Sequence, residues 1–280
     1  MLNPQQTINC QGRLFMFDQP KIMGILNVTP DSFFDGGRFD NPINALKQVE
    51  QMLKEGADII DVGGMSSRPG APILNPVEEQ ARIIPVIKEI RRQFPETVIS
   101  VDTIYSNTVR VVFDLGADII NDISAGSLDN QMFATVAKLQ IPYILMHMQG
   151  KPMDMQNAPA YDDPVQEILD FFIEKVGQLK ALGCKDLIID PGFGFGKSLA
   201  HNYQILKKMH VFSILGLPIL AGVSRKSMIY KLLGTSATEA LNGTSVLNYE
   251  ALCQGSKILR VHDVKAAKEV LQLWQQMEGL

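Results

Sequence analysis

Polar and charged residues recur in this sequence at or directly after the ends of short apolar runs. Alone, each has an ordinary explanation, because an Asp after a strand usually caps a turn or a helix, as we expect for Asp61. A single His such as His147 is as often a hydrogen-bonded packing residue as a catalyst. Gathered together, however, carboxylates, amides and cations could bind a polar ring and an anion. The residues are Asn27, Asp61, Asp102, Asn121, Asp122, His147, Asp190, Ser224, Arg225, Lys226, Arg260 and His262.

Three glycine-rich loops sharpen this prediction. Residues 27–39 form a connection longer than the usual ~4–6 residues, which is typical of functional loops. Residues 63–71 combine glycines, hydroxyls and Arg68, a set that suits a phosphate or diphosphate. Residues 190–198 resemble a Walker A loop but carry Pro191 where that motif needs glycine. We expect this third loop to be flexible and to offer Phe193 and Phe195 to a ring.

The apolar runs themselves predict the elements that position these residues. They are rich in β-branched residues and nearly continuous, as in parallel strands buried on both faces. The predicted strands are residues 22–28, 58–64, 98–103, 118–124, 142–148, 186–192, 218–224 and 256–262. Amphipathic stretches between them predict helices, among them residues 43–55, 76–94 and 164–182.

Eight strand–helix units in 280 residues predict one (β/α)₈ TIM barrel covering residues 1–280, since such barrels have about 250 residues. An open, doubly wound sheet is the alternative. In a barrel the strands' carboxyl ends share one face, which is the active face. Within residues 1–20, TINC and RLFMF flank Gln11 and Gly12 and predict a β-hairpin that closes the opposite end of the barrel. The apolar residues 264–277 predict a packed helix or a dimer face.

Composition excludes several classes of protein. The net charge of −4 and scattered basic residues argue against nucleic-acid binding. Three cysteines without a CxxC pair fit a reducing compartment, and we find no signal peptide or bilayer-length apolar run, so we expect a cytoplasmic protein. A GxGxxG fingerprint and a zinc motif are also missing from the sequence. Oxygen ligands beside a phosphate would instead suit Mg²⁺.

These segments together resemble the dihydropteroate synthase family of pterin-binding enzymes. The resemblance covers residues 22–265 and rests on ILNVTPDSFFDGG, GGMSSRPGA, SVDT, NDIS, LMHMQG, DPGFGFGK, GVSRKS and RVHDV. It implies a transferase of folate biosynthesis that joins 6-hydroxymethyl-7,8-dihydropterin diphosphate to p-aminobenzoate, giving 7,8-dihydropteroate and pyrophosphate. It also implies loss of pyrophosphate before amine attack, Mg²⁺ as cofactor and inhibition by sulfonamides. We expect a homodimer that binds small molecules, without a nucleic-acid or membrane partner.

The resemblance also implies three binding zones. The pterin zone comprises Asp102, Asn121, Asp190 and Lys226, with Met146 against the ring. The diphosphate zone comprises Asn27, Arg68, Arg260 and His262, with Asn27 also a ligand of Mg²⁺. The p-aminobenzoate zone comprises Ser67, Pro69, Phe195 and Ser227, with Lys226 between the two substrates. The implied catalytic residues are Asp102, Lys226, Arg260 and His262.

Two positions depart from the family pattern. Met65 stands where the family commonly has Glu, and Phe34 stands where Ser is frequent. One rival interpretation is a methyltetrahydrofolate-dependent methyltransferase barrel, which would not need the NVTPDSF and SSRPG loops. Another is an inactive scaffold barrel, which would usually lose the anion cluster or Lys226.

Overall fold

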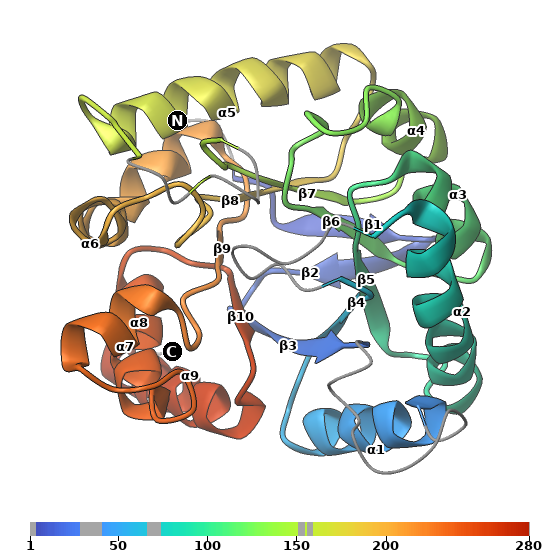
Figure 1. Ribbon diagram of the computed structural model, residues 1–280, viewed down its shortest axis with the longest axis horizontal. Helices are drawn as coiled ribbons and strands as arrows, with labels where there is room; N and C mark the ends of the chain where they lie inside the picture. Colours follow the sequence, from blue (N-terminus) through green and yellow to red (C-terminus); the bar gives the residue numbers. More distant parts are fainter. Residues whose placement is uncertain (1–3, 29–40, 66–73, 151–154, 156–158, 280) are drawn as a thin grey trace.

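Eight parallel strands form a closed barrel in the computed structural model, which describes residues 4–28, 41–65, 74–150, 155 and 159–279 (Figure 1). The strands are β3 (Lys21–Asn27), β4 (Ile59–Gly63), β5 (Val98–Asp102), β6 (Ile119–Asp122), β7 (Tyr143–Met146), β8 (Leu187–Asp190), β9 (Leu220–Ala221) and β10 (Ile258–Val261). Their order in the sheet is β8-β7-β6-β5-β4-β3-β10-β9. A parallel bridge between Ile189 and Ile219 joins the two ends of this order. The barrel is therefore confirmed, and the open sheet is excluded.

Helices surround the barrel, as Figure 1 shows. They are α1 (Asn41–Lys54), α2 (Pro76–Gln93), α3 (Ser106–Asp114), α4 (Met132–Leu139), α5 (Pro164–Ala181), α6 (Leu199–Lys207), the 3₁₀ helix η2 (Met209–Leu215), α7 (Ser227–Leu233), α8 (Leu241–Cys253) and α9 (Val264–Glu278). Helices α2 and α5 begin as the sequence predicts, because Asn75 and Asp163 accept hydrogen bonds from first-turn N–H groups and proline follows each. Helix α9 packs through Val264, Ala267 and Leu271, which confirms a packed C-terminal helix.

One strand is much shorter than predicted. Residues 218–224 yield only the two-residue β9, because the chain turns out of the sheet after Ala221 and Arg225 adopts a left-handed φ of 54°. None of the described helices combines the length and apolarity needed to cross a bilayer.

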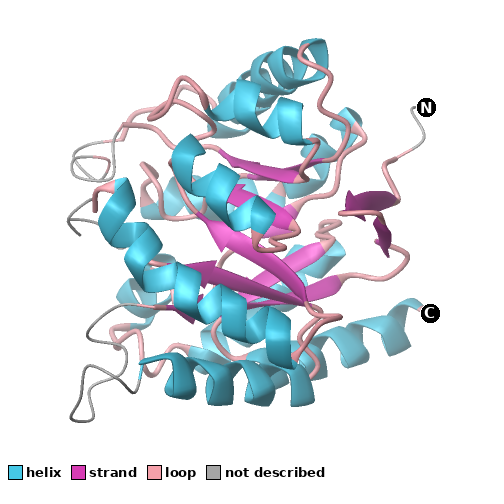
Figure 2. Ribbon diagram, turned by 90° about the vertical axis from the view of Figure 1, so that its right-hand side faces the viewer, coloured by secondary structure: helices cyan, strands magenta, loops and turns pink. Residues whose placement is uncertain are grey.

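A small antiparallel hairpin closes the amino-terminal end of the barrel. Its strands β1 (Thr7–Cys10) and β2 (Arg13–Met16) are joined by Gln11 and Gly12, both with positive φ, as in the tight turns that favour hairpins. Figure 2 shows the hairpin at one end of the molecule. Around it, Ile8, Cys10 and Phe17 pack in one cluster with a residue from each barrel strand: Met23, Ile59, Val98, Ile119, Ile144, Ile188, Leu220 and Ile258. The predicted hairpin and its place are both confirmed.

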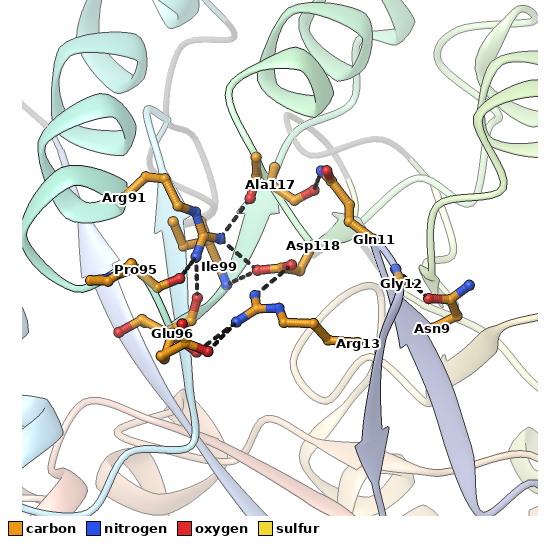
Figure 3. A network of polar contacts seen from close by, with 12 residues as sticks. Asn9, Gln11, Gly12, Arg13, Arg91, Pro95, Glu96, Ile99, Ala117 and Asp118 are labelled. Carbon is orange, nitrogen blue, oxygen red and sulfur yellow. Dashed lines mark hydrogen bonds and ion pairs between the residues drawn. The ribbon is translucent and has the colours of Figure 1, made fainter.

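Asp118 ties this hairpin to the barrel (Figure 3). The carboxylate is buried just before β6, and it accepts hydrogen bonds from Arg13 at 3.1 Å, Arg91 at 2.8 Å and the Ile99 backbone N–H at 2.9 Å. Arg13 comes from β2, Arg91 from α2 and Ile99 from β5. One side chain thus holds three elements together.

We predict that Asp118→Ala lowers the free energy of unfolding by about 1–3 kcal/mol, because it leaves the buried Ile99 N–H unpaired and removes the carboxylate that Arg13 and Arg91 share. Urea denaturation followed by circular dichroism measures this. The control is Asp18→Ala, which removes an exposed carboxylate paired with Lys21 and should leave the midpoint unchanged. Equal midpoints for the two variants would contradict the role of Asp118.

Candidate active site

The carboxyl ends of the strands bring most of the described candidate residues to one end of the barrel. Asn27, Asp102 and Asp190 are the last residues of β3, β5 and β8. The strand register places Gly63 beside both Asn27 and Asp102. A Cβ at Gly63 would lie 3.8 Å from the Asn27 Oδ1 atom and 3.5 Å from the Asp102 Cβ atom. The missing side chain therefore leaves space between these two polar groups.

Asp61 organises one side of this site. It lies within β4 with a fully buried side chain. Its carboxylate accepts hydrogen bonds from Ser100 Oγ at 2.6 Å, Asn121 Nδ2 at 3.1 Å and Arg260 Nε at 2.7 Å. The interpretation of Asp61 as a turn or cap residue is therefore wrong. A signal was present in the sequence, because an Asp inside a strand buried on both faces needs buried partners.

Arg260 joins two of the expected zones. Its Nε atom binds Asp61, while its Nη2 atom lies 2.9 Å from Asp102 Oδ2. Burial raises the pKa of Asp102 above its ordinary value, and the guanidinium of Arg260 opposes that shift. The register places Asn121 next to Asp102. Arg260, expected at the diphosphate, thus directly contacts a residue expected at the pterin.

Asp190 and Lys226 form the facing side of the site. Asp190 is buried, which raises the pKa of its carboxyl, and it accepts a hydrogen bond from the Gly192 N–H at 2.7 Å. The Lys226 ammonium lies 4.0 Å from the centroid of the Phe195 ring. Burial lowers the pKa of Lys226 to about 7, although Asp190 opposes this. Phe195 packs in a small cluster with Met146 and Met155, so apolar surface adjoins these charges.

The loop at residues 190–198 is packed rather than flexible, and this corrects the sequence prediction. Gly192 and Gly196 have positive φ, and a Cβ at either would overlap a backbone carbonyl, that of His147 or Gln149. Phe193 is buried in the main core and does not project into the site. Of the two phenylalanines, only Phe195 joins the cluster of Met146 and Met155.

Several candidates have structural partners. Arg225 makes a two-pronged ion pair with Asp263, at 2.8 and 2.7 Å, and this pair holds the segment before α7. Asp122 accepts hydrogen bonds from Ser124, Gly126 and the Tyr143 hydroxyl. Both residues therefore serve the scaffold.

The two histidines differ in their surroundings. His147 is buried beside Lys197, with its Nδ1 atom 3.0 Å from the Lys197 Nζ atom, which fits the interpretation of a hydrogen-bonded packing residue. His262 contacts Ser224 through its Nδ1 atom at 3.0 Å and is exposed to solvent. Packing around its ring, together with the charge of Arg260, lowers the pKa of His262 to about 4, so the imidazole is neutral at pH 7.

The remaining candidates are placed as follows. Ser227 is the first residue of α7, directly after Lys226. Ser67, Arg68, Pro69 and Phe34 lie outside the described residues. Within the part of the chain that the structure describes, no group of three or more His, Cys, Asp or Glu residues could hold a metal ion. Sequence reasoning included Asp61 but interpreted it as a turn or cap residue, and it missed Ser100 and Lys197 as members of this region.

We predict that Gly192→Ala is far more damaging than Gly234→Ala. Both glycines have similar positive φ, 71° and 65°, so Ala costs about 1–2 kcal/mol at either position. At Gly192 the methyl group also overlaps the His147 carbonyl, whereas nothing lies within 4 Å at Gly234. Thermal unfolding should show the larger loss for Gly192→Ala. Equal losses would mean that the loop can move away from β7 at little cost.

Comparison with known proteins places this site in a family. Residues 23–262 match the model for pterin binding enzymes. Dihydropteroate synthase of Escherichia coli K12 is 45% identical over 265 residues, covering 94% of this chain and 93% of that protein. Two structures of Xanthomonas albilineans dihydropteroate synthase are similar. The one with 4-aminobenzoic acid has a TM-score of 0.92 at 40% identity, covering 98% and 99% of the two chains. The one with 7,8-dihydropteroate has a TM-score of 0.88 at 37% identity, with the same coverage. The chain belongs to the dihydropteroate synthase family of pterin-binding enzymes.

Proposed function

We propose that this protein condenses 6-hydroxymethyl-7,8-dihydropterin diphosphate with p-aminobenzoate, giving 7,8-dihydropteroate and pyrophosphate. The observation that carries the proposal is the ring of buried polar groups, Asp102, Asn121 and Asp190, with Lys226 and Phe195 beside it. Such a ring suits a flat heterocycle with several donors and acceptors. The family of the chain supports the same reaction.

Pterin recognition follows from burial. The amidine-like edge of a pterin presents N–H donors beside ring acceptors, and a buried site must pair all of them. Asp102 and Asp190 can accept from these N–H groups, while Asn121 can both donate and accept. Because the Asn121 amide already donates to Asp61, its orientation is fixed before a ligand binds. Met146 offers apolar contact to the ring from the end of β7.

The chemical step needs stabilisation of charge at two places. The bond between the pterin methylene carbon and the diphosphate oxygen breaks, and its electron pair leaves with pyrophosphate. The Asp102 carboxylate is placed to stabilise the resulting cation, and losing one such preorganised group typically costs about 10²–10³ in rate. The amine nitrogen of p-aminobenzoate then forms the C–N bond and releases a proton. An aromatic amine is already unprotonated at pH 7, so it needs little activation.

Asn27, Arg260 and His262 would hold the diphosphate, with Arg68 outside the described residues. The side-chain oxygen of Asn27 suits Mg²⁺, and this ion usually takes its remaining ligands from water and substrate phosphates. Bound there, Mg²⁺ would offset the charge of the leaving group. His262 is neutral at pH 7 and would donate a hydrogen bond to a phosphate oxygen through its Nε2 atom.

For p-aminobenzoate, the described residues of the proposed site are Phe195, Lys226 and Ser227. The Phe195 ring can pack on the benzoate ring, and Lys226 lies between this position and the pterin residue Asp190. Ser67 and Pro69 complete the proposed site from outside the described residues.

We also propose a cytoplasmic homodimer. Three free cysteines, Cys10, Cys184 and Cys253, fit a reducing compartment. Helices α7, α8 and α9 lie side by side, and they expose large apolar side chains that a second copy could cover. These side chains are Leu232, Leu233, Leu241, Val246, Leu273 and Met277.

The proposed reaction is tested by mixing the purified protein with Mg²⁺, the dihydropterin diphosphate and p-aminobenzoate. We expect equal amounts of pyrophosphate and 7,8-dihydropteroate, measured by a coupled phosphate assay and by mass spectrometry. A folded protein that binds the pterin but forms neither product would match the inactive scaffold barrel and would refute the proposal.

We predict that Lys226→Ala lowers kcat at least tenfold, because Lys226 lies between the two proposed substrate positions, with its ammonium over the Phe195 ring. Steady-state kinetics measure the change, and circular dichroism checks the fold. The matched control is Lys231→Ala, an exposed lysine on α7, the helix that directly follows Lys226, and it should leave kcat within twofold of the unmodified protein. Near-normal turnover by Lys226→Ala would remove this residue from the mechanism.

A further inference from the structure

Lys197 is a buried lysine that the proposed reaction does not use. Only 3% of its surface is exposed, and its ammonium contacts the Phe195 carbonyl at 2.9 Å, the His147 carbonyl at 3.2 Å and His147 Nδ1 at 3.0 Å. Among the described residues, no carboxylate oxygen lies within 4.0 Å of this ammonium, whose hydrogen-bond partners are those three acceptors. Burying a charge in this way is costly unless every donor is paired.

The three contacts match the three N–H groups of one ammonium. Two are backbone carbonyls, which can only accept, and the third is an imidazole nitrogen that accepts when the ring carries its proton on Nε2. Burial lowers the pKa of His147 to about 2, so this ring is neutral at pH 7. Burial also lowers the pKa of Lys197 to about 7, although Asp190 opposes this.

These hydrogen bonds join two segments that the site requires. His147 directly follows β7, whereas Phe195 lies in the turn after β8. Without side chains, Gly192 and Gly196 allow the turn to approach the backbone of residues 147–149 closely, and Lys197 fastens it there. The carbonyl of Phe195 is therefore held by Lys197, while its ring lies under the Lys226 ammonium.

We propose that Lys197 is a positioning residue for the p-aminobenzoate side of the site, acting through Phe195 and, beyond it, Lys226. This inference rests on the proposed function, because it concerns the residues assigned to the second substrate. Lys197 does not contact the substrates; it sets the position of the ring that does.

Binding of each ligand tests this role without turnover. Calorimetry measures the affinity for 6-hydroxymethyl-7,8-dihydropterin, an alcohol without the leaving diphosphate. A second titration measures p-aminobenzoate in the presence of this alcohol and pyrophosphate. For Lys197→Met we expect the dissociation constant of p-aminobenzoate to rise about tenfold, the size of a lost buried cation–ring contact, while that of the pterin changes less than threefold. The control, Lys207→Met, removes an exposed lysine from α6 and should change neither constant.

A merely structural role would lower the fraction of binding-competent protein for both ligands and leave both dissociation constants unchanged. An unchanged constant for p-aminobenzoate in Lys197→Met, with normal binding by the unmodified protein, would overturn the role of Lys197 alone. Failure of the unmodified protein to bind p-aminobenzoate would instead contradict the proposed function. If Lys197→Met does not fold, Lys197→Gln keeps part of the hydrogen bonding and should show the same selective loss.

The path through Phe195 has its own test. Phe195→Leu removes the ring under Lys226 without removing the Lys197 hydrogen bonds to backbone carbonyls. If Lys197 acts through this ring, adding Lys197→Met to Phe195→Leu should weaken p-aminobenzoate binding less than threefold further. Multiplied losses of about a hundredfold would overturn that path.

Discussion

A buried carboxylate in the middle of a strand is the constraint on which the rest of this site depends. Asp61 lies inside β4 without solvent, so its charge must be matched by partners from other strands. Arg260, 199 residues away on β10, supplies the matching cation. That cation reaches Asp61 only because the barrel brings β4, β3 and β10 together. Asn121 shares the same carboxylate, and Arg260 also holds Asp102. The groups of the proposed pterin site are thus oriented by the scaffold before a ligand arrives.

The two ends of the barrel have different roles: apolar packing dominates the amino-terminal end, and the candidate site lies at the carboxyl end. At the amino-terminal end, the hairpin and one apolar residue from each strand form a sealed cluster, fastened by Asp118. This cluster stabilises the fold without placing apolar side chains at the opposite end, where the candidate site lies. At the carboxyl end, the buried carboxyl groups Asp102 and Asp190 are retained although burying each is costly. The turn around Gly192 packs closely against the backbone of residues 147–149, which holds Phe195 in place before a ligand binds.

The sequence was sufficient to predict the barrel, because nearly continuous apolar runs alternate with amphipathic helices. It also predicted the hairpin and most strand-end residues, whose placement follows from the parallel topology. The hydrogen-bond partners of residues inside the barrel were harder to predict from the sequence. Asp61 was interpreted locally, whereas its partners come from β5, β6 and β10. The glycines of residues 190–198 led us to predict a flexible loop. In the structure they allow the loop to pack closely against the backbone that follows β7, a tertiary contact that the local sequence does not reveal. Lys197 was missed for the same reason.

The central claim is that the charge of Asp61 organises the proposed pterin site, and Asp61→Asn tests it most directly. The substitution keeps the shape of the side chain and removes the charge that Arg260 and Asn121 share. Calorimetric titration with 6-hydroxymethyl-7,8-dihydropterin measures the consequence, with cooperative unfolding as proof that the barrel is intact. We predict a dissociation constant at least tenfold higher than that of the unmodified protein. An unchanged constant in a folded variant would show that Asp102, Asn121 and Arg260 hold their positions without Asp61, and would contradict this account.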